Sequence, residues 1–193
     1  MHMTILLANT IPATEIIAQI IGIIAMAFNI LSYQQKNQRY IIAWQLLGTT
    51  LFTVNFFLLG AYTGALLNAV GIVRAIVFLY KKQLRTDHPF WLIGFIAVYI
   101  LSYILTFTAF GTEFNLPNAL VEILPVVGMT ATTLAFRSKT AKSTRLLGLI
   151  SAPSWLIYNI VAQSMGAIFC AAFCLVSILV GLFRFDRKQT LDK

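Results

Sequence analysis

The feature of this sequence that most constrains its fold is a regular alternation of long apolar runs with short clusters of basic residues. A helix needs about 20 mostly apolar residues to cross the hydrocarbon core of a bilayer. The runs show no sustained alternation of apolar and polar residues, which argues against membrane strands. They predict an all-α integral membrane protein with seven transmembrane helices, at Ile16–Tyr33, Tyr40–Leu59, Gly64–Tyr80, Phe90–Phe110, Leu120–Phe136, Leu146–Val161 and Gly166–Phe183.

The composition supports a membrane location. The chain of 193 residues is 59% apolar and 10% charged, whereas a soluble domain carries roughly 25% charged residues. The net charge of +8 comes from basic residues that lie between the apolar runs, a distribution typical of membrane topology and not of a nucleic-acid-binding face. The lipid bilayer is therefore the expected partner, and no nucleic acid is expected.

The lysines and arginines also predict the orientation. Thirteen of the fourteen follow the first, third, fifth or seventh apolar run, and the other loops hold none. Because basic residues are enriched in cytoplasmic loops, we expect a bacterial inner-membrane protein with a periplasmic N-terminus and a cytoplasmic C-terminus. The first run lacks the preceding basic residues of a signal peptide, so it is expected to be a retained helix.

One basic residue, Arg74, lies inside an apolar run. It stands seven residues before Lys81, roughly 10 Å from the cytoplasmic end of its helix. Its side chain could snorkel to the interface or pair structurally. The alternative is a buried partner for an acid or an anionic substrate. Glu122, the acid well inside a span, lies near the outer end of the fifth run, so direct pairing with Arg74 is not expected.

The first and last three apolar runs resemble each other and predict an internal repeat. Small or polar residues recur at helical spacing in the first helix of each triplet, at Gly22, Ala25, Asn29 and Ser32 and at Gly128, Ala131, Ala135 and Ser138. The third helices both carry a face of small residues, which favours close helix packing and a narrow cavity between them. The unmatched fourth run gives both triplets the same orientation, as in parallel transporter repeats. The predicted units are residues 12–82, a linker with the fourth helix at 83–113, residues 114–184, and a cytoplasmic tail at 185–193.

The three–one–three order resembles the SWEET and PQ-loop sugar transporters. The run Trp155-Leu-Ile-Tyr158-Asn159 is similar to their Trp-Leu-Ile-Tyr-Gly motif, and Phe52 stands at the tryptophan position of the first triplet. The resemblance places a substrate-binding asparagine at Asn68 and the second one near Cys170. The family's Pro-Gln pairs are replaced by Gln34-Gln35 and Phe136-Arg137. Over nearly its whole length, the chain is also similar to the YgjV-like bacterial inner-membrane proteins.

These observations predict a substrate site made of Asn68, Phe52, Trp155, Cys170, Ser177, Asn29 and Asn159. An amide both donates and accepts hydrogen bonds, which suits a small uncharged polar solute, and the aromatic rings could stack on a ring of the solute. The alternative is that the amides, including Asn55, hydrogen-bond between helices and hold them together. Cys170 and Cys174 are expected to be packing residues and not a disulfide or metal site.

The most consistent function is a facilitator or exchanger of a small polar solute through a cavity between the third and seventh helices. The alternative is a non-transporting scaffold or regulatory protein with the same fold, which the missing hinge prolines favour. An enzyme is not expected, because the sequence offers no nucleophile–base arrangement and no metal-ligand spacing. No cofactor is expected, and the oligomeric state is left open.

Overall fold

The computed structural model describes residues 13–58, 62–109, 112–161 and 165–186, without the side chains of residues 62–66 and 165–166. Parts of both predicted hairpins, most of the predicted C-terminal tail and residues 1–12 lie outside this description. The described residues form seven α-helices followed by a short π-helical turn: α1 (Ala13–Ser32), α2 (Gln38–Leu58), α3 (Tyr62–Leu79), α4 (Pro89–Thr108), α5 (Leu116–Arg137), α6 (Ala141–Val161), α7 (Met165–Gly181) and η1 (Leu182–Asp186).

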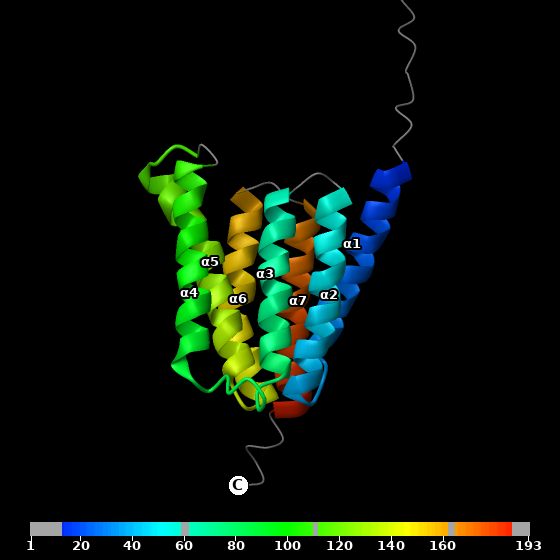
Figure 1. Ribbon diagram of the computed structural model, residues 1–193. Helices are drawn as coiled ribbons and strands as arrows, with labels where there is room; N and C mark the ends of the chain where they lie inside the picture. Colours follow the sequence, from blue (N-terminus) through cyan, green and yellow to red (C-terminus); the bar gives the residue numbers. More distant parts are fainter. Residues whose placement is uncertain (1–12, 59–61, 110–111, 162–164, 187–193) are drawn as a thin grey trace, which may run out of the picture.

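Each predicted apolar run corresponds to one of these helices, which stand side by side (Figure 1). Within the described residues, five helices are long and apolar enough to cross a membrane, namely α1, α2, α4, α5 and the segment Ala167–Asp186. Helices α3 and α6 have 18 and 21 residues and run alongside the other five (Figure 1). The all-helical prediction is therefore confirmed.

The predicted starts of two helices are wrong by about one turn. Helix α5 begins at Leu116 because Asn115 accepts a hydrogen bond from the Asn118 amide at 2.9 Å and caps it. Helix α6 begins at Ala141, where Thr140 Oγ1 accepts from the Ser143 amide at 3.1 Å. The prediction places Arg39, Lys142 and Arg145 in the loops before α2 and α6, whereas the structure places them inside these helices.

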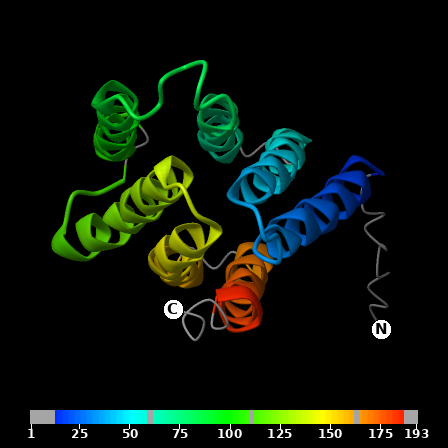
Figure 2. The same cartoon turned by 90° about the horizontal axis from the view of Figure 1, so that it is seen from below.

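Six of the described helices form a ring, and within each triplet the neighbours in sequence are neighbours in space. Helix α2 packs against both α1 and α3, and α6 packs against both α5 and α7. Contacts of α1 with α7 and of α3 with α5 close the ring, whereas α4 packs on the outer side of α5 (Figure 2). The two triplets therefore face each other across the centre of the bundle.

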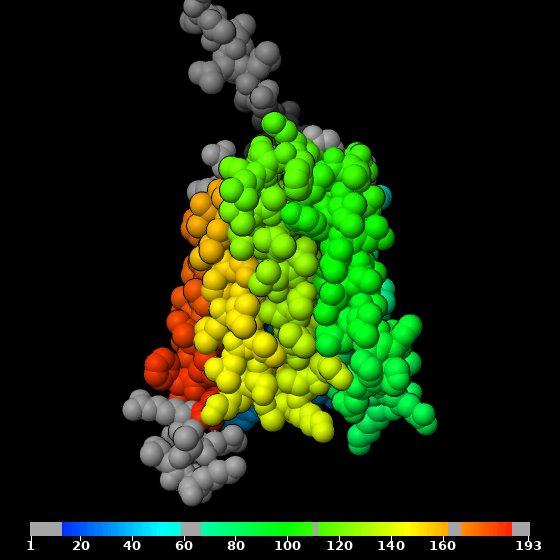
Figure 3. Space-filling model, turned by 90° about the vertical axis from the view of Figure 1, so that its left-hand side faces the viewer, coloured from blue at the N-terminus to red at the C-terminus, as the bar shows by residue number. Residues whose placement is uncertain are grey.

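The bundle has an apolar exterior. Large hydrophobic side chains are exposed on every helix; among them, Phe90, Ile93, Ile157 and Phe173 are 65%, 63%, 51% and 51% exposed. Figure 3 shows the face that α4, α5, α6 and α7 present. In lipid such exposure is favourable, since the hydrocarbon is as apolar as the side chains.

A compact apolar cluster fills one side of the interior. It joins α2, α3, α4 and α5 through Ile42, Ala75, Val77, Phe78, Phe95, Tyr99, Met129 and Phe136. The rings of Phe78 and Phe136 meet edge to face, with centroids 6.3 Å apart. This cluster connects α4 to the rest of the bundle and leaves the space between the two triplets to other residues.

Candidate functional site

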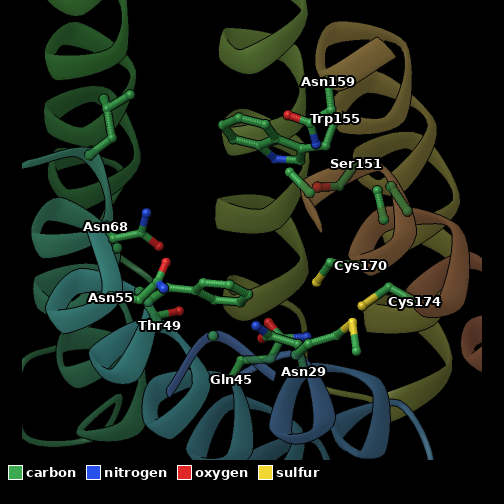
Figure 4. A pocket seen from close by; sticks show the side chains of 18 of the residues that line it. Asn29, Gln45, Thr49, Asn55, Asn68, Ser151, Trp155, Asn159, Cys170 and Cys174 are labelled. Atoms are coloured by element: carbon green, nitrogen blue, oxygen red, sulfur yellow. The ribbon is translucent and has the colours of Figure 1, made fainter. Parts of the chain in front are cut away.

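A cavity of about 610 Å³ lies between the two triplets, lined by residues of α1, α2, α3, α5, α6 and α7 (Figure 4). The lining extends along α1 from Gln19 to Asn29 and on to Tyr33 in the turn that follows, and along α6 from Ser151 to Asn159. Polar side chains contribute from both triplets: Asn29, Gln45, Thr49, Asn55, Asn68, Arg74, Thr132, Ser151 and Asn159. The bundle thus has an interior space whose walls combine apolar side chains with a group of polar ones.

Six of the seven residues predicted for the site line this cavity: Asn68, Phe52, Trp155, Cys170, Asn29 and Asn159. Ser177 does not. It is buried below the cavity, where its hydroxyl donates to Ile30 O at 2.6 Å and accepts from Gln34 Nε2 at 2.9 Å. The cavity is lined by α3 and α7, and the ring arrangement adds residues of α1, α2, α5 and α6 to the same space.

Sequence reasoning missed Gln45, Thr49 and Phe56, which line the cavity together with Phe52. These four positions follow one another at intervals of four, three and four residues, which places them on one face of α2. The spacing was visible in the sequence as a polar and aromatic stripe. The stripe alone does not show whether this face of α2 borders a cavity or another helix.

Two of the cavity-lining amides also hold helices together. Asn55 Nδ2 donates to Ala18 O at 2.7 Å and so joins α2 to α1. Gln45 Nε2 donates to Ser32 Oγ at 3.2 Å across the same helix pair. Such bonds in membrane proteins contribute about 0.6 kcal/mol on average. The structural alternative considered for Asn55 is therefore supported by its contact with α1.

Glycines on the first helix of each triplet allow the second helix to approach closely. A Cβ atom on Gly22 would stand 3.0 Å from Asn55 Nδ2, and one on Gly128 would stand 2.9 Å from Trp155 Nε1. Both distances are shorter than van der Waals contact. The positions of Asn55 and Trp155 at the cavity wall therefore depend on the absence of a side chain at the facing glycines.

The side chain of Arg74 is buried and does not snorkel to the interface. Its residue is 9% exposed and lines the cavity. Nη1 donates to Tyr99 Oη at 3.1 Å and to Met129 O at 3.4 Å, and the guanidinium carbon lies 5.2 Å from the centre of the Phe136 ring. The guanidinium does not extend to the membrane interface because these partners on α4 and α5 hold it within the bundle. Arg74 is therefore a charged group in the cavity wall.

A layer of buried polar contacts lies at the end of the bundle that carries the turns 33–37, 80–88 and 138–140 and η1, which we call the basic end. Gln34 Nε2 donates to Ser177 O at 2.7 Å and joins the end of α1 to α7. Arg145, which is fully buried, donates to Tyr33 O at 2.9 Å, to Gln35 O and to the carboxylate of Asp186. These contacts join the two triplets beneath the cavity.

Lys81, in the turn after α3, adds contacts to this layer between α2 and α5. Its Nζ donates to Gln38 Oε1 at 2.8 Å and to Ser138 O at 2.6 Å, and Gln38 Nε2 donates to Ala135 O at 2.7 Å. Partial burial lowers the pKa of Lys81 to about 8, although the nearby carboxylate of Asp87 opposes the shift. The beginning of α2 is thereby joined to the end of α5.

Other chemistry has little support in the described part of the chain. No group of three or more His, Cys, Asp or Glu side chains lies close enough there to hold a metal ion. Cys170 and Cys174 are free thiols, and Glu122 is not among the residues that line the cavity. The arrangement offers a polar, aromatic-lined space with one guanidinium and no described reactive cluster.

An apolar helical bundle around a polar cavity defines a multi-pass membrane protein. Residues 16–189 match the family model Imp-YgjV, described as bacterial inner membrane protein. The chain belongs to this family and is thus a bacterial inner-membrane protein. It is similar to "Inner membrane protein YgjV" of Escherichia coli (strain K12), with 26% identity over 173 residues that make up 90% of this chain and 86% of that protein. No solved structure matches. The YgjV-like resemblance is confirmed.

Proposed function

We propose that this protein is a facilitator or exchanger of a small polar solute, which passes through the cavity between the two triplets. The observation that carries the proposal is the cavity of about 610 Å³, whose largely apolar walls hold a group of amide, hydroxyl and guanidinium side chains inside an apolar bundle. Buried polar groups in a membrane are costly and concentrate along substrate pathways. Its volume lies within the range of small-molecule sites, about 300–1,000 Å³.

We further propose that all seven helices cross the membrane and that the triplets are parallel repeats, as in the SWEET-like arrangement. Two matched contacts support the repeat. Ser32 Oγ donates to Asn29 O at 2.6 Å, and Ser138 Oγ donates to Ala135 O at 2.7 Å. Gly22 and Gly128 likewise both face a cavity-lining side chain of the next helix. The fourth helix then serves as the linker between the triplets.

In this mechanism the solute enters the cavity while the contacts at the basic end are closed. The bonds of Gln34 to Ser177 and of Arg145 to Tyr33 and Gln35 join the triplets there. Their donors and acceptors can exchange partners with water, so each bond contributes only about 0.5–1.5 kcal/mol, or somewhat more from a charged donor. A small relative movement of the triplets would open the basic end and release the solute.

The proposed test is solute flux in proteoliposomes. Purified protein would be reconstituted and challenged with a broad panel of labelled polar metabolites that includes neutral sugars, amides and organic acids. We expect at least one solute class to equilibrate faster than in protein-free vesicles. Asn68→Ala should slow this flux about tenfold, because it removes an amide from the cavity wall.

Thr50→Ala is the matched control, since Thr50 lies on α2 beside the cavity-lining Thr49 but its own side chain is exposed to lipid. Its flux should equal that of the unaltered protein. Absence of flux and binding across the panel would contradict the transport proposal and favour a non-transporting scaffold. Flux that Asn68→Ala leaves unchanged would remove Asn68 from the site.

A further inference from the structure

Building on the proposed transport function, we infer that the solute carries a carboxylate, which Arg74 binds in the cavity. The expectation of an uncharged solute rested on the amides of the wall. Among the residues that line the cavity, Arg74 is the single side chain with a formal charge at neutral pH. A solute that enters this space therefore meets one fixed positive charge.

The guanidinium of Arg74 is held from one side only. Nη1 is occupied by Tyr99 Oη and Met129 O at 3.1 and 3.4 Å. Nε is buried and has no hydrogen-bond partner within the described residues. Nη2 has no hydrogen bond to a described residue either. Tyr99 and Met129 thus fix the orientation of the group and leave its Nε–Nη2 edge without a protein partner.

Of the two remaining nitrogens, Nη2 is the one that a ligand in the cavity can reach, because protein atoms enclose Nε. A carboxylate oxygen accepts a charge-assisted hydrogen bond from a guanidinium N–H, which is roughly twice as strong as a bond between neutral groups. An amide or hydroxyl oxygen of a neutral solute satisfies Nη2 less well, since it carries no full charge. The accessible Nη2 therefore favours a carboxylate over a neutral solute.

The charge balance leads to the same conclusion. A buried guanidinium costs several kcal/mol to desolvate unless an anion compensates it. The ion pair within the described residues is formed by Arg145 and Asp186, and no described carboxylate lies within ion-pairing distance of Arg74. The ring of Phe136 and the two oxygen acceptors compensate part of that cost. A bound anion would compensate the remainder.

The absence of a side chain at Gly71 lets α3 pack closely against α2 beside Arg74. A Cβ atom there would stand 3.9 Å from Arg74 Nη2 and 3.1 Å from Thr49 Cγ2. Gly71 and Thr49 both line the cavity. A methyl group at position 71 would therefore press on Thr49 and lie in van der Waals contact with Nη2, so a side chain there would disturb the wall next to the guanidinium.

The test compares solutes that differ in charge and little else. Flux of glucuronate and glucuronamide, and of lactate and lactamide, would be measured in proteoliposomes with the unaltered protein and with three variants. Arg74→Gln removes the charge, Arg74→Lys keeps the charge but lacks the guanidinium Nη2, and Thr49→Asp places a competing carboxylate in the wall near Arg74. Arg137→Gln is the control, because Arg137 bonds to Asp87 O in a loop outside the cavity.

We expect the unaltered protein and Arg137→Gln to move at least one acid about tenfold faster than its amide, the factor for a charge-assisted hydrogen bond. Arg74→Gln and Thr49→Asp should abolish that preference, and Arg74→Lys should reduce it. Thr49→Asp keeps Arg74 and supplies a carboxylate from the protein itself to neutralise it. This variant therefore tests the carboxylate site even if Arg74→Gln fails to fold. Equal flux of acids and amides in the unaltered protein would overturn the carboxylate site and leave the transport proposal standing. Absence of flux for every solute would overturn both.

Discussion

Arg145 Nη1 lies 2.8 Å from Asp186 Oδ2, with side-chain exposures of 0% and 9%, so this ion pair is almost completely enclosed at the basic end of the bundle. The same guanidinium donates to the backbone of Tyr33 and Gln35 in the turn that follows α1. Phe185 covers it, with the guanidinium carbon 5.1 Å from the ring centre. Three chain segments distant in sequence therefore meet at Arg145.

The ion pair predicts the effect of removing its acid. Asp186→Ala should lower the free energy of unfolding by about 3 kcal/mol, because it leaves a buried guanidinium without its carboxylate. Unfolding in detergent micelles, followed by circular dichroism, measures this. Glu113→Ala, which removes an exposed carboxylate, is the control and should change stability little. A loss for Asp186→Ala no larger than that of the control would show that the pair does not stabilise the fold.

Gly181 in α7 packs against Tyr33 and Arg145, so a side chain at this position should destabilise the fold. A Cβ atom on Gly181 would stand 2.6 Å from Tyr33 O and 2.8 Å from Arg145 Nε. Gly181→Ala should therefore cost about 1–3 kcal/mol, as overpacking does. Gly94→Ala adds the same methyl group where nothing lies within 4 Å, and should be neutral or slightly stabilising. Equal unfolding free energies for the two variants would contradict the packing of α7 against the turn after α1.

Lys81 predicts a dependence of stability on pH. Its pKa is lowered to about 8 in the folded protein, whereas an unfolded lysine titrates near 10.4. Between these values the unfolded state binds more protons, so stability gains with rising pH. The difference in thermal midpoint between the unaltered protein and Lys81→Met should grow in favour of the unaltered protein from about pH 8 to pH 10. A constant difference would show that the pKa of Lys81 is not lowered.

The charge pattern predicts the sidedness of the basic end. In a background with Cys170→Ser and Cys174→Ser, a cysteine at exposed Lys139 should react with a membrane-impermeant thiol reagent in inverted vesicles and not from the periplasm. A cysteine at exposed Glu113, beyond the opposite end of the bundle, should show the reverse. Labelling of position 139 from the periplasm would show that the orientation is the reverse of the one proposed.

Sequence patterns predicted the helices and several of the polar wall residues, because burial in lipid demands long apolar segments and makes each polar side chain within them conspicuous. Asn29 and Asn68 are such polar positions and line the cavity, as does Trp155, which the family resemblance indicated. The starts of α5 and α6 were missed because polar caps at Asn115 and Thr140 extend the helices beyond their apolar parts.

Other features depend on contacts between distant segments and leave no local signal. The pairing of Arg145 with Asp186 joins positions 41 residues apart, and Gln34 meets Ser177 across 143 residues. Arg74 stands out in the sequence as a basic residue inside an apolar run. Its burial, however, depends on Tyr99 and Met129, which the packing of α4 and α5 brings to it. Sequence alone therefore could not decide between snorkelling and a position in the cavity wall.

The most direct test of the central claim, that the cavity is the path of the solute, uses the native thiol of Cys170, which lines it. In a Cys174→Ser background, Cys170 would be modified with a bulky methanethiosulfonate reagent while the flux of a transported solute is measured. The account predicts that flux falls to the level of protein-free vesicles as modification reaches completion, and that Cys170→Ser removes the sensitivity. Complete modification of Cys170 with unchanged flux would contradict it.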